Sequence, residues 1–253
     1  MSELIRSQKI ILASILVLIW MLESAIPFIH GRSHRLRHAG RNLALGLVNT
    51  FLSGIITATL LTIVSSWTEH SQFGLLYFLK LPDFAASIFA IFLLDGWMYC
   101  WHRANHALPF LWRLHRLHHS DREMDVTTAV RFHPGEALIS SGLRLIVVAL
   151  LGLSLSQILL YDTLLVAVIF LHHSNINLPL FIDKFLRIAI TTPSLHRVHH
   201  STIIQETHSN FGSVFSFWDR LASTFRLRID QAAIVYGVED QDSIFTKYLR
   251  VNQ

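Results

Sequence analysis

Cysteine is almost missing from this sequence of 253 residues, because Cys100 is the only one. A single cysteine excludes an internal disulfide and a metal site built from thiolates. The sequence also has no CxxC pair, no CxxCH haem-attachment motif and no glycine-rich phosphate-binding loop. We expect Cys100, which lies at the end of an apolar run, to be a packed thiol.

Charged residues are scarce as well. Only 15% of the residues are charged and 52% are hydrophobic, and the mean hydropathy is +0.44. Together with long apolar runs, these values indicate a membrane protein rather than a soluble domain. The net charge of +4 comes from arginines beside the apolar segments, where they orient loops and meet anionic headgroups. No aromatic and basic pattern suits nucleic acid, which is therefore not an expected partner.

Several apolar stretches approach or exceed the roughly 20 residues that a spanning helix needs. They cover residues 9–29, 43–67, 84–101 and 137–171, and the last has room for two spans that turn near residues 152–156. Glu23 and Pro27 predict an interfacial or broken last turn in the first stretch, which is too long for a cleavable signal peptide. The sequence therefore predicts an all-α integral membrane bundle with about four or five spans.

Arginines predict the orientation of this bundle. The loop after the first stretch has no acidic residue and carries Arg32, Arg35, Arg37 and Arg41. Such a loop is expected in the cytoplasm, whereas the nearly uncharged loop after the second stretch is expected on the opposite side. The later spans then return the chain to the cytoplasm with its histidine-rich segments. Arg6 and Lys9 conflict with this orientation, so the direction of the first span stays open.

Histidine is the residue that the sequence has in excess. Of 16 histidines, 12 lie between His102 and His208. They include an HxxxH pair, two HxxHH triplets and an HH pair: His102 and His106; His115, His118 and His119; His196, His199 and His200; His172 and His173. Positions i, i+3 and i+4 of a helix share one face, so each cluster can present two or three imidazoles to one point. One HxxHH alone is equally typical of an exposed helix, but the repetition favours more than one metal ion.

Two further residues are candidates for supporting roles beside the ligands. Asp95 lies two helical turns before His102, where its carboxylate can accept the second ring N–H of a ligand histidine. His133 precedes Pro134, so we expect it in a loop, as an extra ligand or as a hydrogen-bonding support.

The HH pair and the early histidines are interpreted differently. We expect His173 to be the ligand of the pair, with His172 beside it and Asn175 as a polar neighbour. Four further histidines are expected outside the site, in a solvated or headgroup-facing basic loop (His30, His34 and His38) and in an outer loop (His70).

The order of these motifs is HxxxH, HxxHH, a single histidine before an asparagine, and HxxHH. Their flanks read DGWMYCWHRANH (95–106), LWRLHRLHHSD (111–121), RFHP (131–134), HHSNINLP (172–179) and TPSLHRVHHS (192–201), followed by NFG (210–212) and FWDRLASTFR (217–226). Over residues 42–226 the chain resembles the fatty acid hydroxylase and sterol desaturase superfamily of integral membrane non-haem di-iron enzymes, and in particular its bacterial sterol-desaturase-like branch.

The resemblance implies two iron ions, which zinc can replace in an overexpressed sample, with O2 as co-substrate. It also implies a lipid substrate, such as a sterol, a fatty acyl chain or a related isoprenoid-like molecule. The implied ligands are His102, His106, His115, His118, His119, His173, His196, His199 and His200. The family usually has an acid two residues before the asparagine of its closing motif, and this chain has His208 there, which adds a ligand or alters the local charge.

A mechanism fits the residue types. Neutral imidazoles leave a ferrous pair with its full positive charge, able to bind and reduce O2. An unactivated C–H bond offers no handle for acid–base chemistry, so the metal pair must supply the reactivity, and the outcome is hydroxylation or desaturation. The sequence shows no flavin, haem or ferredoxin-type site, so electrons are expected from an external ferredoxin or small haem protein with its reductase. A basic cytoplasmic face would suit an acidic carrier, and the lipid would arrive laterally from the bilayer.

We expect three parts: an N-terminal span and basic loop (1–41), a membrane-embedded catalytic domain with a cytoplasmic histidine-rich helical cap for the two metals (42–226), and a tail (227–253). Two other classes stay open. A zinc-dependent membrane hydrolase would need an acid to activate water, and Glu123, Asp125 and Glu136 are available, although none lies in an HExxH motif. A metal transporter or non-catalytic metal-binding membrane protein is less favoured, because the histidines lie beyond the span ends.

Overall fold

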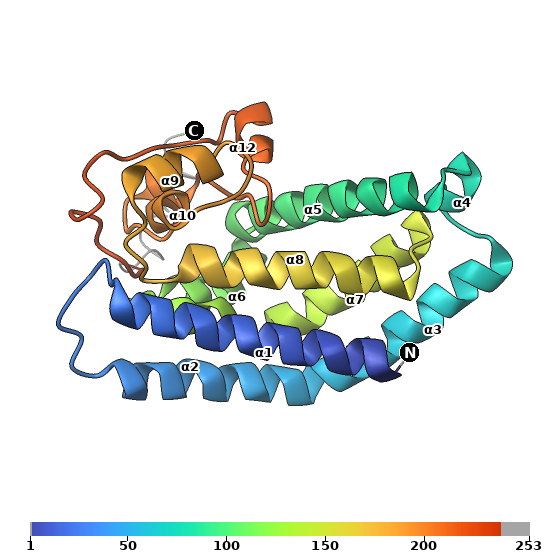
Figure 1. The fold of residues 1–253 in the computed structure, drawn as a ribbon, viewed down its shortest axis with the longest axis horizontal. Coiled ribbons are helices and arrows are strands. Elements are labelled where there is room, and N and C mark those ends of the chain that lie inside the picture. Colours follow the sequence, from blue (N-terminus) through green and yellow to red (C-terminus); the bar gives the residue numbers. More distant parts are fainter. Residues whose placement is uncertain (1, 239–253) are drawn as a thin grey trace.

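The computed structural model describes residues 2–238, and within that range it is built from helices, with no strand beyond three isolated β-bridges. Figure 1 shows the long helices side by side, with the short helices and loops of residues 174–238 gathered at one end. In chain order the elements are α1 (Ser2–Ala25), α2 (Arg35–Asn49), the π-helix η1 (Thr50–Gly54), α3 (Ile55–Ser71), α4 (Leu75–Leu79), α5 (Asp83–Ala107), α6 (Pro109–His119), the 3₁₀-helix η2 (Val126–Val130), α7 (Pro134–Leu151), α8 (Leu155–His173), α9 (Leu180–Leu186), α10 (Pro193–His199), α11 (Ile204–Thr207) and α12 (Phe217–Leu221).

Five helical segments are long and apolar enough to cross a membrane, which confirms the predicted all-α bundle. They are Glu3–Ala25, Arg35–Leu79, Asp83–Ala107, Pro134–Leu151 and Leu155–His173. Large apolar side chains on their outer faces are exposed, as a lipid-facing surface requires, and Phe51 and Phe78 are each 81% exposed. Cys100 also lies on an exposed side of α5, so the prediction of a packed thiol was wrong.

The predicted turn between the last two spans lies where the sequence placed it. Gly152 ends α7 with a positive φ of 71°, and Ser154 begins α8 as an N-cap whose side chain accepts from the Gln157 backbone N–H. Gly74 packs against this turn so closely that a Cβ there would approach the Gly152 Cα to 2.4 Å. The turn brings α7 and α8 together around a core of buried apolar residues that also includes Leu94 of α5.

The first span ends at Ala25, two residues before Pro27, which agrees with the predicted early end. Glu23 in its last turn is buried and accepts hydrogen bonds from the Arg35 guanidinium and from the backbone N–H groups of Val126 and Asn175. This carboxylate therefore links the end of α1 to α2, η2 and the end of α8.

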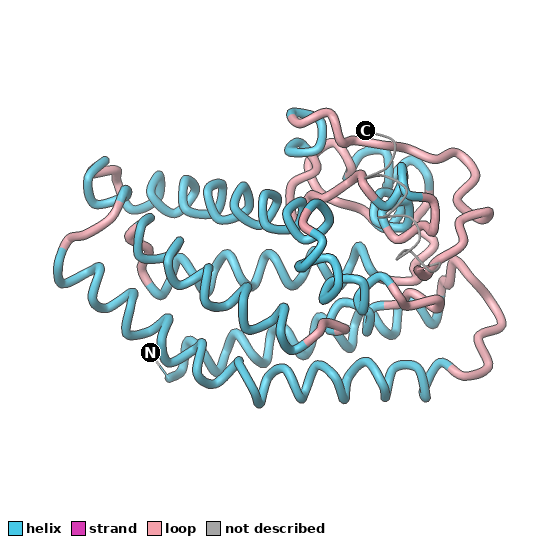
Figure 2. Tube along the Cα trace, turned by 180° about the vertical axis from the view of Figure 1, so that it is seen from behind, coloured by secondary structure: helices cyan, strands magenta, loops and turns pink. Residues whose placement is uncertain are grey.

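The proposed division of the chain at residues 41 and 226 stays a prediction. α1 packs along α8, so the N-terminal span belongs to the same bundle as the later helices. Most of the predicted tail, residues 239–253, lies outside the described residues. We call residues 174–238 the C-terminal cap; Figure 2 shows its loops and short helices at one end of the bundle.

Candidate metal centre

Nine histidines from α5, α6, α8 and α10 converge in two neighbouring groups near the ends of the spans. One group has five members and the other has four: His102, His106, His115, His119 and His199; His118, His173, His196 and His200. Within each group the chosen ring nitrogens all lie within 4.8 Å of one another. These are the nine histidines that the sequence indicated as metal ligands.

Each HxxHH triplet contributes to both groups. In α6, His115 and His119 join the first group, whereas His118 joins the second. Neighbouring positions on a helix differ by about 100°, so adjacent histidines point in different directions. The rings of His119 and His200 stack with centroids 4.4 Å apart, which shows how close the two groups lie.

Hydrogen bonds fix the ring tautomers in the first group. The Nδ1 of His102 lies 2.9 Å from the Phe211 carbonyl oxygen, and the Nδ1 of His199 lies 2.7 Å from the Ser209 carbonyl oxygen. Each Nδ1 must donate to its carbonyl, so each neutral ring presents a lone pair at Nε2. These two Nε2 atoms are 3.0 Å apart. Two lone pairs at that distance repel each other unless a cation lies between them.

The second group repeats this arrangement. The Nδ1 of His173 donates to the Ile169 carbonyl oxygen at 2.9 Å, which leaves a lone pair at Nε2. That Nε2 lies 3.1 Å from the Nε2 of His118 and 2.9 Å from the Nε2 of His196. His200 Nε2 is in turn 3.1 Å from His196 Nε2.

Burial keeps these rings neutral. The histidines of α6 and α10 are buried, and loss of water lowers the pKa of His118, His119, His196, His199 and His200 well below the ordinary value of 6.5. Repulsion from neighbouring histidines lowers each pKa further. Neutral imidazole is the form that binds metal ions.

Several buried ring nitrogens have no hydrogen-bond partner, including both nitrogens of His106 and of His119 and the Nε2 of His115. An unpaired buried polar atom is costly, so native structures give it a partner. A pair of divalent cations, one in each group, would supply that partner to the nitrogens that point inward. The donor set therefore fits two metal ions of the kind that favour imidazole, such as iron or zinc.

One carboxylate supports a candidate ligand, and the sequence did not single it out for that role. Glu136 is buried near the start of α7, and its Oε1 accepts from the His115 Nδ1 at 2.7 Å and from the Asn105 amide at 3.5 Å. A carboxylate behind a ligand histidine orients the ring and raises its basicity. The sequence offered Glu136 only as an acid for a hydrolase. The available sequence signal for Glu136 was its position just after the His133-Pro134 pair.

Asp95 does not contact a histidine in the described structure, so the expected role for its carboxylate was wrong. Asp95 is fully buried and accepts four hydrogen bonds at 3.0–3.1 Å, from Tyr161 Oη, Val214 N, Phe215 N and Trp218 Nε1. The two helical turns between Asp95 and His102 carry the carboxylate away from the metal groups. Asp95 instead ties α5 to α8 and to the C-terminal cap.

The other expected supporting residues lie around the site. His133 is in a loop, as predicted, and its Nδ1 accepts from Gly135 N at 3.0 Å as the N-cap of α7. Asn175 exchanges two hydrogen bonds with the backbone of Ile29 rather than with a ligand ring. His172 is buried and packs on His196 with ring centroids 3.9 Å apart, outside both groups.

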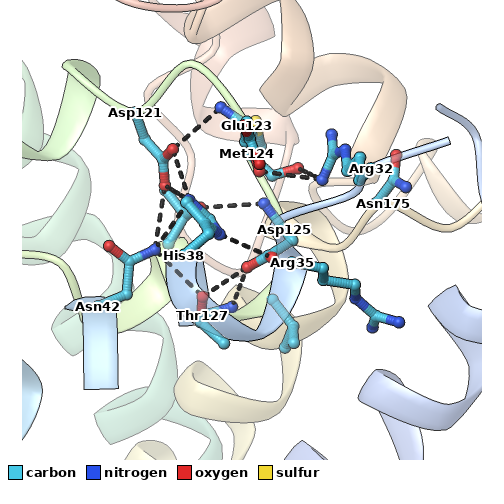
Figure 3. Close-up of polar contacts among 12 residues, drawn as sticks. Arg32, Arg35, His38, Asn42, Asp121, Glu123, Met124, Asp125, Thr127 and Asn175 are labelled. Atoms are coloured by element: carbon cyan, nitrogen blue, oxygen red, sulfur yellow. Dashed lines mark hydrogen bonds and ion pairs between the residues drawn. The ribbon is translucent and has the colours of Figure 1, made fainter. Parts of the chain in front are cut away.

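A second polar cluster lies beside the metal groups and includes His38, which the sequence placed in a solvated loop. Figure 3 shows the His38 ring between two carboxylates: its Nε2 lies 2.7 Å from Asp121 and its Nδ1 lies 3.0 Å from Asp125. Both nitrogens face acceptors, so both donate and the ring is an imidazolium. The cluster fastens α2 to the loop that directly follows the histidines of α6. The placement of His38 in a solvated loop was therefore wrong.

His208, which replaces the usual acid, lies at the edge of the first group. Its ring centroid is 5.7 Å from that of His106, but it belongs to neither group. Desolvation lowers the pKa of His208, which favours the neutral form of its ring.

A cavity of about 720 Å³ adjoins both groups. His102 and His115 of the first group and His118, His173 and His196 of the second form part of its wall. The rest of the wall comes mainly from apolar and small residues of α2, η1, η2, α5 and α7 and of the loop after η2. Among them are Leu43, Gly46, Leu47, Met98, Trp101, Ala129, Val130, Phe132 and Ala137. Its size falls in the range of small-molecule binding sites.

Comparison with known proteins gives related sequences. Residues 87–224 match the fatty acid hydroxylase family. An ornithine lipid hydroxylase of Rhizobium tropici is 34% identical over 128 residues, which cover 51% of this chain and 38% of that protein. The alkylglycerol monooxygenase of Caenorhabditis elegans is 29% identical, covering 63% of this chain and 31% of that protein. The human alkylglycerol monooxygenase is 26% identical over a region that covers 88% of this chain and 46% of that protein.

The chain thus spans less than half the length of these curated relatives. No solved structure matches it.

Five apolar helices and two groups of histidines, all buried except the half-buried His102, define a multi-pass membrane protein with a site suited to metal ions. The family match covers more than half of the chain, and the chain belongs to the fatty acid hydroxylase family. This confirms the resemblance that its histidine motifs carry.

Proposed function

We propose that this protein is a membrane-bound, O2-dependent di-iron oxidoreductase that hydroxylates a lipid. The observation that carries the proposal is the pair of facing Nε2 lone pairs of His102 and His199, 3.0 Å apart, next to an apolar cavity. The relatives named as lipid hydroxylases and monooxygenases favour hydroxylation over desaturation.

The nine histidines are the proposed metal ligands, five for one ion and four for the other. When bound, iron supplies the reduction of O2 and the oxidation of an unactivated C–H bond, which side chains alone do not perform. Glu136 holds the His115 ring by its Nδ1–H. The backbone carbonyls of Phe211 and Ser209 hold the His102 and His199 rings in the same way. The chain's own contribution is to fix these rings, exclude water and position one carbon of the lipid.

The cavity supports access from the bilayer. Leu47 of α2 lines the cavity and is also 69% exposed on a membrane-spanning segment, and Thr50, the first residue of the π-helix η1, is likewise both lining and exposed. π-Helical turns are frequent at functional sites. A lipid can therefore reach the histidines laterally, between the α2–η1 segment and α7, and place its apolar chain against the cavity wall.

Electrons would come from an external donor, a ferredoxin or a small haem protein with its reductase. Arg103, Arg113 and Arg122 lie near the ligands of α5 and α6 and are exposed. Such a basic surface attracts an acidic carrier. Under this proposal the metal site and these arginines face the cytoplasm.

The test is lipid oxidation by variants that each lose one ligand from a different group. We expect His118→Ala and His199→Ala to abolish the oxidised lipid in extracts of expressing cells, measured by mass spectrometry, while both proteins remain in the membrane fraction. The matched control is His70→Ala, because His70 is exposed at the end of α3 and bonds the Ser66 carbonyl oxygen. Oxidised lipid from either ligand variant, or its loss in the control, would overturn the proposal.

The two alternative classes predict other results. A zinc-dependent hydrolase would release a hydrolysed product without O2, and a transporter or non-catalytic metal protein would leave the lipid unchanged. The Oε1 of Glu136 accepts from His115 Nδ1, which supports a role in positioning that ring.

A further inference from the structure

The C-terminal cap carries an exposed apolar surface outside the histidine site. In α9 and the turn after it, Leu180 is 64% exposed, Phe181 73%, Phe185 74% and Ile188 67%. At the end of α12, Leu221 is 75% exposed. We call these five residues, with the half-buried Phe217, the α9–α12 face. Exposed apolar patches of this kind mark surfaces that contact a partner or a membrane.

The position of α12 along the span α5 indicates which surroundings the α9–α12 face contacts. The Trp218 ring lies 4.8 Å from the Phe92 ring and Phe217 lies 5.6 Å from it, both measured between centroids. Gly96 allows this approach, because a Cβ there would come within 3.0 Å of the Trp218 ring. Asp95, which accepts from Trp218, is about 18 Å from the C-terminal end of α5. α12 therefore lies beside a membrane span and not beyond its end.

α9 is tied to the segment that carries α12. The Ser216 hydroxyl donates to the Arg187 carbonyl oxygen at 2.8 Å, and the Ser216 N–H donates to the Ala189 carbonyl oxygen at 3.1 Å. The Arg220 guanidinium donates to the same Arg187 oxygen at 2.7 Å. The backbone that follows α9 thus contacts the start of α12. Figure 1 shows both helices at the same end of the bundle.

The face continues the exposed apolar surface of the candidate span α5. Phe84, Ile88 and Phe92 on the outer side of the span α5 are 78%, 53% and 40% exposed. An exposed lysine, Lys184, lies within the α9 part of the face, three residues after Phe181. A cation among apolar side chains at a membrane boundary can reach the anionic headgroups while the apolar groups enter the acyl region.

We propose that the α9–α12 face inserts into the bilayer leaflet on the side of the cap, at the boundary between headgroups and acyl chains. The cap would then be held against the membrane by its own apolar surface as well as by the ends of α5 and α8. The occupant is lipid with anionic headgroups, and the proposal does not depend on the enzymatic activity.

The test uses the fact that Cys100 is the only cysteine. In a Cys100→Ser background, Phe185→Cys and Leu221→Cys each place one cysteine on the face, for labelling with an environment-sensitive fluorophore. The matched control is Ile229→Cys, an apolar cap residue that is 101% exposed and lies off the face. Each labelled protein is placed in nanodiscs that contain phosphatidylglycerol, with or without a phospholipid that carries a nitroxide on its acyl chain.

We expect the labels at 185 and 221 to emit at shorter wavelength than the label at 229, and to be quenched at least twofold more by the acyl nitroxide. Emission at all three sites typical of water would overturn the proposal. Emission typical of an apolar environment without quenching by the nitroxide would also overturn it, because another protein surface would then cover the face. Gel-filtration profiles equal to that of the Cys100→Ser parent show that the variants are folded.

Discussion

At the scale of single residues, the site depends on which ring nitrogen of each histidine is already engaged. His102, His115, His173 and His199 each use Nδ1 as a donor to a carbonyl or carboxylate oxygen, which directs Nε2 inward. The grouping of these histidines was predictable, because the i, i+3, i+4 spacing needs only a helix. Glu136 was not predictable as their partner, because α7 brings it to α6 only in the folded chain.

Removing the Glu136 carboxylate should weaken metal binding in the group that contains His115. We expect Glu136→Ala to lower the affinity for one of two ions by about 10- to 100-fold, since the His115 ring loses its orienting acceptor. Glu136→Gln should have a smaller effect, because its amide oxygen can still accept. Competition with a chelator measures the affinity, and Glu69→Gln, at an exposed acid near the end of α3, is the control. An unchanged affinity in Glu136→Ala would contradict this role.

The buried histidines also predict how the metal-free protein responds to pH. Burial lowers the pKa of His199 and His200 far below 6.5, whereas in the unfolded chain both take up protons near that value. The unfolded state binds more protons below pH 6.5, so the free energy of unfolding should fall as the pH is lowered through this range. We expect the Tm of chelator-treated protein to be lower at about pH 5.5 than at about pH 7.5. A Tm that does not change, or that rises, would count against neutral buried rings.

At the scale of elements, the spans could be predicted from apolar length alone, and the turn at Gly152 from its sequence. The attachment of the C-terminal cap to the side of α5 could not be predicted from the sequence. It depends on Asp95, whose four donors come from Tyr161 of α8 and from residues 214–218, more than a hundred positions later. An acid within an apolar run predicts a functional contact, but the sequence does not name the partner.

Asp95→Asn tests this attachment. The amide has one acceptor oxygen where the carboxylate has two, and its NH2 would face groups that are themselves donors. We expect a loss of about 1–3 kcal/mol in the free energy of unfolding, seen as a lower Tm in detergent. Asp83→Asn at the exposed start of α5 should leave the Tm unchanged. Equal Tm values for Asp95→Asn and the parent would show that the attachment does not depend on this carboxylate.

At the scale of the whole molecule, one end of a five-helix bundle combines two histidine groups, a cavity of about 720 Å³ and the basic surface of α5 and α6. The sequence indicated the bundle and the nine histidines. It misplaced His38, because a histidine among arginines is typical of a solvated loop and the pairing with Asp121 and Asp125 arises only when α2 meets the loop after α6.

The central claim is that the nine histidines hold two metal ions. The most direct test is to measure the metal content of protein extracted from iron-replete cells by elemental mass spectrometry. We predict about two metal ions per chain, mainly iron, and about one in a His196→Ala, His200→Ala double variant that keeps the first group intact. Fewer than about one ion in the unaltered protein, or two ions retained by the double variant, would contradict the account.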